Sequence, residues 1–147
     1  MSTLLFHPSS LPVSDKLHVL LNNHFQQQLT QSESIAQSTY LTFNFRDSSY
    51  SSEAGGFHPV EIAMTQISSG LWNVEYITDF AYVGNVYPEL ARCLDFDFRD
   101  QAFFTEFGGW SPIKGNYSAV EMFELWQDNF LNYIDMEAFD SISITSQ

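Results

Sequence analysis

The sequence predicts an α+β fold, in which a mainly antiparallel sheet of about five strands has two helices packed on one face. Three observations support this prediction. Residues 14–29 and 118–134 carry apolar side chains at helical spacing. Between them lie alternating or apolar segments separated by glycine-containing turns. The chain has 147 residues, which suits a single domain over residues 1–147 that can fold without disulfides.

The first predicted elements are a helix and a strand. The helix of residues 14–29 places its leucines in one stripe, and Ser14 is a suitable N-cap. The segment TYLTFNFR at 39–46 alternates between apolar and polar residues, as expected for a strand with one buried face. We expect the serine-rich residues 30–39 to form the connection between them.

Residues 57–67 and 71–82 are predicted to form a hairpin, because Gly70 suits the short connection between them. Counting outward from a three-residue loop predicts the pairs Met64–Val74, Ile62–Tyr76, Val60–Thr78 and His58–Phe80. The core face would then contain Val60, Ile62, Met64, Trp72, Val74, Tyr76 and Phe80. The opposite face would carry the carboxylates of Glu61, Glu75 and Asp79 and would be at least partly solvated.

In the second half of the chain, one segment is compatible with two kinds of secondary structure. Residues 87–98 fit either a short helix that begins at Pro88 or a strand ending in LDFDFR. Residues 102–113 favour a strand that ends at a Gly-Gly turn. The helix of residues 118–134 begins with a capping-box pattern, and FDSISITS near the end is typical of a short last strand.

Composition restricts the partners and the location. The chain has 18 acidic and 5 basic residues and a net charge of −13, which repels nucleic acid phosphates and anionic membranes. A basic partner and mimicry of nucleic acid are two possible reasons for this charge, but simple solubility is favoured, because only 16% of the residues are charged and they are dispersed. The lone Cys93 excludes an internal disulfide and lies in an apolar stretch typical of an inert thiol. The start does not resemble a signal peptide, so the expected location is the cytoplasm.

The stretch NFRDSSYSSEAGGFHPVEI at 44–62 concentrates polar side chains between two predicted strands. Together with the facing strand, it gives a candidate binding surface of Arg46, Asp47, Tyr50, Glu53, His58, Glu61, Glu75 and Asp79. We expect Arg46 to form an internal ion pair. Pro59 favours an extended chain, in which His58 and Glu61 point to opposite faces, so His58 is interpreted as structural rather than catalytic.

The carboxylates of Glu61, Glu75 and Asp79 permit two interpretations. The predicted register puts Glu61 diagonal to the other two, at about 7–8 Å. Such a group could hold Mg²⁺ or Ca²⁺ or act as an acid–base pair, but a solvated face is the simpler interpretation. The histidines and Cys93 show no zinc-binding spacing. We therefore predict no catalytic residue, no metal site and no cofactor.

The stretch at 44–62, with YITDFAY at 76–82 and the later FGGW and LWQDNFLNY, resembles a bacterial domain-of-unknown-function family. This is the family numbered two-seven-eight-seven, found in vibrios and related gammaproteobacteria. The resemblance covers nearly the whole chain from residue 11. It implies a small stand-alone cytoplasmic protein and transfers no catalytic residue, cofactor or partner.

Three functional hypotheses follow. The favoured one is a non-enzymatic protein-interaction module, whose partner is another protein or a second copy of the chain joined through a strand edge. Direct binding to nucleic acid or membranes is not expected. The alternatives are a metal-assisted hydrolase that uses Glu61, Glu75 and Asp79, and an acidic mimic of DNA.

Overall fold

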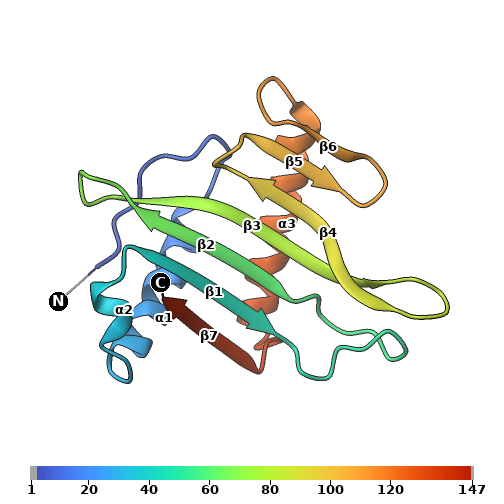
Figure 1. The fold of residues 1–147 in the computed structure, drawn as a ribbon, viewed down its shortest axis with the longest axis horizontal. Helices are drawn as coiled ribbons and strands as arrows, with labels where there is room; N and C mark the ends of the chain where they lie inside the picture. The colour runs from blue at the N-terminus through green and yellow to red at the C-terminus, as the bar shows by residue number, and fades with distance from the viewer. Residues whose placement is uncertain (1–2, 147) are drawn as a thin grey trace.

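The computed structural model describes residues 3–146, which form one antiparallel sheet and three helices (Figure 1). The strands are β1 (Tyr40–Arg46), β2 (Val60–Gln66), β3 (Trp72–Val83), β4 (Glu89–Asp97), β5 (Ala102–Thr105), β6 (Gly109–Pro112) and β7 (Ser141–Ser146). The helices are α1 (Asp15–Leu29), α2 (Ser34–Gln37) and α3 (Tyr117–Asp135). The strand order is β6-β5-β4-β3-β2-β1-β7, and every neighbouring pair is antiparallel.

The prediction of about five strands and two helices is wrong, because the described residues form seven strands and three helices. The segment with two predicted structures is strand β4, which pairs with β3 and β5 and so has backbone partners on both sides. The Gly-Gly turn leads into the additional strand β6. The predicted connection at 30–39 contains the single-turn helix α2.

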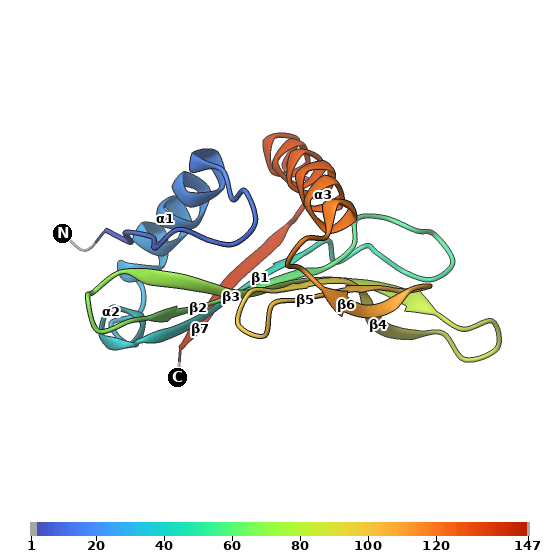
Figure 2. The same ribbon diagram turned by 90° about the horizontal axis from the view of Figure 1, so that it is seen from above.

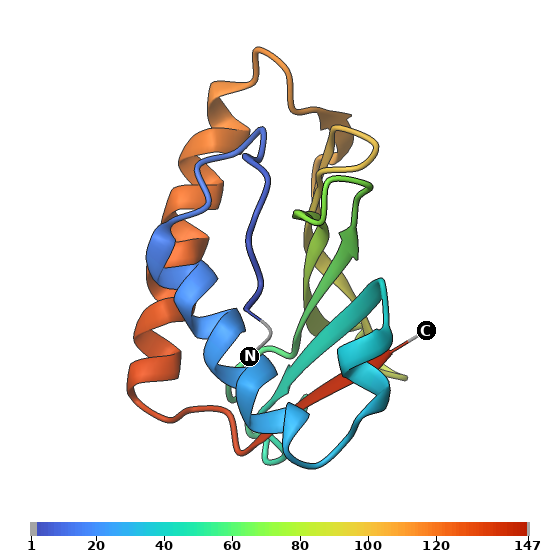
Figure 3. The same cartoon turned by 90° about the vertical axis from the view of Figure 1, so that its left-hand side faces the viewer.

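The helices α1 and α3 lie over the same face of the sheet, while no helix covers the opposite face within the described residues (Figures 2 and 3). Aromatic rings fill much of the layer between these two helices and the sheet. The buried rings include Phe43, Phe45, Phe96, Phe123, Trp126, Phe130 and Phe139. None of the described helices is long and apolar enough to cross a membrane.

A buried glutamine links α3 to the chain that leads into α1. The side chain of Gln127 accepts a hydrogen bond from the backbone N–H of Ser14 at 2.9 Å. Its amide nitrogen donates to the carbonyl of Pro12 at 3.2 Å. Because N–H groups at a helix start lack intrahelical partners, this side chain satisfies one of them at Ser14, and its second bond to Pro12 holds the preceding chain beside α3.

A bulge in β3 decides which of its side chains face the helices. The pair Met64–Val74 forms as predicted, but the register shifts between Ala63 and Met64, so that Ile62 pairs with Ile77 rather than Tyr76. A one-residue shift exchanges the two faces of a strand. Asp79 therefore pairs with Val60 and lies on the helix-covered face, opposite to its predicted side.

The second bulge lies between β3 and β4. Asp79 pairs with Leu94, whereas Phe80 pairs with Arg92, which leaves Cys93 as the extra residue of β4. Bulges break the strict alternation of side chains along a strand. Both bulges therefore change the surroundings of Asp79.

Candidate functional site

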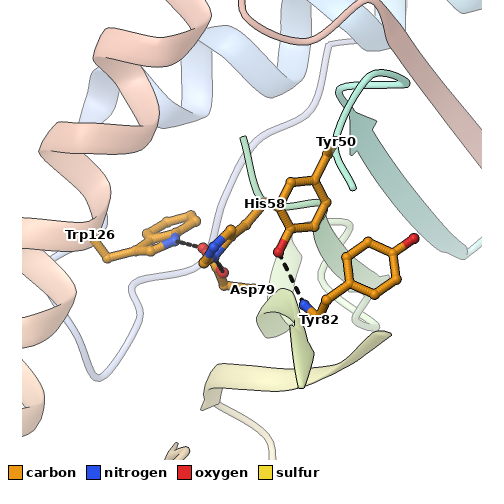
Figure 4. A network of polar contacts seen from close by, with 5 residues as sticks. All are labelled: Tyr50, His58, Asp79, Tyr82 and Trp126. Atoms are coloured by element: carbon orange, nitrogen blue, oxygen red, sulfur yellow. Dashed lines mark hydrogen bonds and ion pairs between the residues drawn. The ribbon is translucent and has the colours of Figure 1, made fainter. Parts of the chain in front are cut away.

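A hydrogen-bonded group centred on Asp79 joins the sheet to α3 (Figure 4). His58 Nδ1 lies 2.7 Å from Asp79 Oδ1, and Trp126 Nε1 donates to Asp79 Oδ2 at 3.1 Å. The Asp79 side chain is 13% exposed and that of His58 is 42% exposed. The bond to Asp79 raises the pKa of His58 and outweighs the opposing effect of its burial. The half-exposed imidazole therefore lies at the edge of the site, beside the carboxylate that raises its pKa.

The loop between β1 and β2 is folded around the carboxylate of Asp47. This carboxylate accepts hydrogen bonds from the Ser49 hydroxyl at 2.6 Å, the Ser49 N–H at 3.0 Å and the Phe57 N–H at 3.1 Å. Gly55 and Gly56 follow with φ values of 72° and 134°, which turn the chain back toward β2. The polar stretch is therefore folded back on itself around Asp47, and the Ser48 N–H also donates to Asp140 at 2.9 Å.

Tyr50 attaches this loop to the end of β3. Its ring centroid lies 5.4 Å from that of His58 and 5.2 Å from that of Tyr82, and its hydroxyl accepts a hydrogen bond from the Tyr82 N–H at 3.0 Å (Figure 4). The loop and the β3–β4 hairpin are therefore held at a fixed separation.

Two hollows adjoin at this site. The first, of about 290 Å³, lies between the sheet and α3 and is mainly apolar; we call it the α3 pocket. Its walls are Gly56, Phe57, His58, Val60, Asp79, Leu94, Met122, Leu125, Trp126, Asn129, Phe130, Tyr133 and Phe139. The second, of about 600 Å³, lies between the Asp47 loop and the β3–β4 hairpin; we call it the loop groove. Gly56 and His58 line both hollows, so the α3 pocket and the loop groove adjoin at these two residues.

Comparison with known proteins now places the chain in a family. The family described as "Protein of unknown function (DUF2787)" matches residues 15–145. The chain belongs to the DUF2787 family. This confirms the resemblance drawn from the stretch at 44–62. A comparison with curated proteins gives no match.

Solved structures from Vibrio cholerae resemble this DUF2787 protein over nearly its full length. The hypothetical protein VC0508 from the VSP-II pathogenicity island is 55% identical, with a TM-score of 0.91 over 98% of this chain and 99% of that chain. The conserved hypothetical protein VC1805 from the pathogenicity island VPI-2 is 53% identical, with a TM-score of 0.84 over 96% and 100% of the two chains. VC1805 is described as sharing structural homology with the human P32 protein.

The structure of the DUF2787 protein brings together only part of the predicted surface. Tyr50, Glu53 and His58 line the loop groove, His58 and Asp79 line the α3 pocket, and Asp47 holds the loop in place. Arg46 is exposed at the end of β1 and forms no ion pair within residues 3–146, so the expected internal pair is absent there.

The three carboxylates predicted to share a face lie apart. Glu61 accepts a hydrogen bond from the Tyr76 hydroxyl on the face away from the helices. Glu75 is the extra residue of the first bulge, and its carbonyl accepts from the backbone N–H groups of Phe98 and Arg99. Because Asp79 lies under α3, this arrangement gives no support to a metal or acid–base site built from all three.

Sequence reasoning missed two residues of the site. Trp126 was recognisable only as part of the apolar stripe of α3, and Cys93 only as a buried thiol. Among the described residues, one group of three potential metal ligands has its donor atoms within 4.8 Å of one another: His58, Asp79 and Cys93. No short sequence motif predicts this group, because its three members come from separate segments of the chain.

Acidification is expected to release the Asp47 loop. Hydrogen bonds from the Ser49 hydroxyl and the Phe57 N–H hold the pKa of Asp47 below its ordinary value of 3.8. The resulting stabilisation is fully present above that value and is lost as the pH falls through the lowered pKa. Hydrogen exchange, expressed as protection factors for the Ser49 and Phe57 amides across this range, measures the effect.

The variant Asp47→Asn is the control for this experiment, because an amide does not titrate there. Its protection factors are expected to be lower at neutral pH and to stay constant on acidification. Equal acid sensitivity in the wild type and in Asp47→Asn would assign the transition to other carboxyl groups.

Proposed function

We propose that this protein is a small, cytoplasmic, non-enzymatic interaction module that holds an extended segment of a partner protein. The observation that carries this proposal is the track formed by the α3 pocket and the loop groove, which adjoin at Gly56 and His58. Extended segments bind well to such tracks, because alternate side chains can enter pockets while the backbone follows the surface. The free thiol of Cys93 agrees with a reducing compartment.

The apolar end of the track suits a large anchoring side chain. Phe57, Trp126 and Tyr133 contribute aromatic walls, and Leu125 stands at the rim with 57% of its surface exposed. Binding energy in protein interfaces is concentrated in a few such buried anchors. We infer that the partner segment carries one aromatic or branched aliphatic side chain that fills the α3 pocket.

The negative charge of the protein indicates which residues the partner segment carries beside its apolar anchor. Glu53 lines the loop groove, and the whole chain carries a net charge of −13. Such a field speeds the approach of basic partners and disfavours acidic ones. The segment is therefore expected to place lysine or arginine near the loop groove, next to its apolar anchor.

Hydrogen bonds already hold the loop side of this surface in place before binding. Asp47 closes the loop on itself, and Tyr50 fixes it to β3. Preorganisation of this kind strengthens binding, since less conformational freedom is lost in the complex.

Site-specific photo-crosslinking in a vibrio host tests the proposal. A photoreactive phenylalanine analogue at Leu125 and, separately, at Glu53 should capture the same protein, and mass spectrometry should map both crosslinks to one extended, basic segment. The analogue at Val19 serves as the control, because Val19 is 55% exposed on α1 and lines neither hollow.

The affinity of the captured segment then measures the contribution of the pocket. Leu125→Arg is expected to weaken binding by about 2 kcal/mol, or roughly 30-fold, as for other interface hot spots. Val19→Arg should leave the affinity unchanged. Crosslinks that scatter equally over all three positions, or equal affinities of the two variants, would contradict the proposal.

A further inference from the structure

Three side chains with different metal-binding atoms converge beside the α3 pocket. His58 precedes β2, Asp79 lies in β3, and Cys93 is the extra residue of the β4 bulge that faces Asp79. A nitrogen, an oxygen and a sulfur donor from these residues lie within 4.8 Å of one another. Without the bulge, strict alternation would send Cys93 to the face opposite its neighbour Leu94, which lines the pocket.

We propose that His58, Asp79 and Cys93 bind a divalent transition metal ion, with Zn²⁺ as the best match. Zinc takes nitrogen, oxygen and thiolate ligands in tetrahedral geometry, whereas Mg²⁺ and Ca²⁺ prefer oxygen ligands alone. Tetrahedral zinc sites place their donor atoms about 3.3–3.6 Å apart. On metal binding, the 2.7 Å separation of His58 Nδ1 and Asp79 Oδ1 would widen, and the three donor atoms, now within 4.8 Å of one another, would adjust to this spacing.

The surroundings support a cation at this point. Trp126 Nε1 donates to Asp79 Oδ2, which leaves Oδ1 directed at His58; this is the kind of outer contact that orients metal ligands. Burial and the nearby carboxylates of Asp79 and Glu106 raise the pKa of the Cys93 thiol. A bound dication would reverse that effect, because it neutralises the negative charge and stabilises the thiolate.

Three protein ligands leave one tetrahedral position for water or for a donor atom of a bound molecule. Sites with such an open position differ from closed structural zinc sites, which have four protein ligands. The inference does not rest on the interaction proposed above, because it concerns only the three side chains and the ion.

Cobalt titration tests the inference directly. The tag-free, reduced protein should take up one equivalent of Co²⁺, with tetrahedral d–d bands and a thiolate-to-cobalt charge-transfer band, and Zn²⁺ should displace the cobalt. Cys93→Ser should remove the charge-transfer band. His58→Asn and Asp79→Asn should weaken binding by about 100-fold or more, since even outer contacts change metal affinity 10–100-fold.

His24→Asn and Glu61→Gln are matched controls, because both lie outside the three-ligand group and should bind cobalt as the wild type does. A measurement on the wild type alone guards against misfolded variants: Zn²⁺ should protect Cys93 from alkylation by iodoacetamide. The inference is overturned if the wild type takes up no metal. It is equally overturned if folded Cys93→Ser gives the same cobalt spectrum, or if zinc leaves the alkylation rate unchanged.

Discussion

Replacing Phe45 with alanine is expected to lower the free energy of unfolding by about 3–5 kcal/mol. Phe45 is fully buried in β1, and its ring meets those of His24, Phe130 and Phe139 at centroid distances of 5.9, 5.1 and 6.0 Å. Three parts of the chain, α1, α3 and the segment before β7, thus pack on one side chain. Because a domain is stable by only about 5–15 kcal/mol, this is a large share of the total.

Urea unfolding followed by tryptophan fluorescence and circular dichroism measures this loss. Phe107→Ala is the matched control, because that ring is 96% exposed and its removal should change the free energy by less than about 0.5 kcal/mol. Similar urea midpoints for Phe45→Ala and Phe107→Ala would contradict the predicted loss of stability.

Replacing Gly56 with alanine is expected to open the Asp47 loop and to destabilise the protein by about 2–3 kcal/mol. Gly56 has a φ of 134°, and a Cβ atom there would lie 2.8 Å from Asp47 Oδ2 and 3.1 Å from the Cα of Tyr50. The new methyl group would therefore push the carboxylate away from the Phe57 N–H and displace the backbone that carries Tyr50. Both walls of the loop groove depend on these contacts.

Gly55→Ala provides the comparison for this prediction. Gly55 also has a positive φ, of 72°, but nothing lies within 4 Å of the Cβ position, so only the left-handed backbone penalty of about 1–2 kcal/mol applies. Hydrogen exchange at the Tyr82 N–H, which donates to the Tyr50 hydroxyl, should accelerate in Gly56→Ala and remain slow in Gly55→Ala. Equal exchange in the two variants would contradict the steric argument.

The sequence predicted the two long helices, α1 and α3, because local signals determine them, but it missed the single-turn helix α2. Ser14 caps α1 as expected, with the Leu17 N–H 3.2 Å from its hydroxyl. The predicted capping box, formed by Ser118 and Glu121, placed the start of α3 slightly late. Asn116 is the N-cap instead, and its side chain accepts from the Ala119 N–H at 3.1 Å. Either polar residue can cap a helix, so the choice depends on the preceding chain.

The sheet was predicted less well, because bulges leave no reliable pattern in the sequence. Tyr76 and Ile77 are both large and apolar, and either could continue the buried face after Val74. The structure buries Ile77 and turns Tyr76 outward, where its hydroxyl meets Glu61. The same shift moved Asp79 beneath α3. The candidate site was therefore visible in its loop and in His58, but not in the contacts among His58, Asp79 and Trp126.

The pairing of β1 with β7 has a consequence for synthesis of the protein. Leu41 pairs with Ser146, so one edge of the sheet is completed by residues translated long after β1 has left the ribosome. Until then β1 presents an unpaired edge, and such edges recruit strands from other chains. A nascent chain stalled before Ser141 should be a target for chaperones, and a fragment that ends there should aggregate rather than fold.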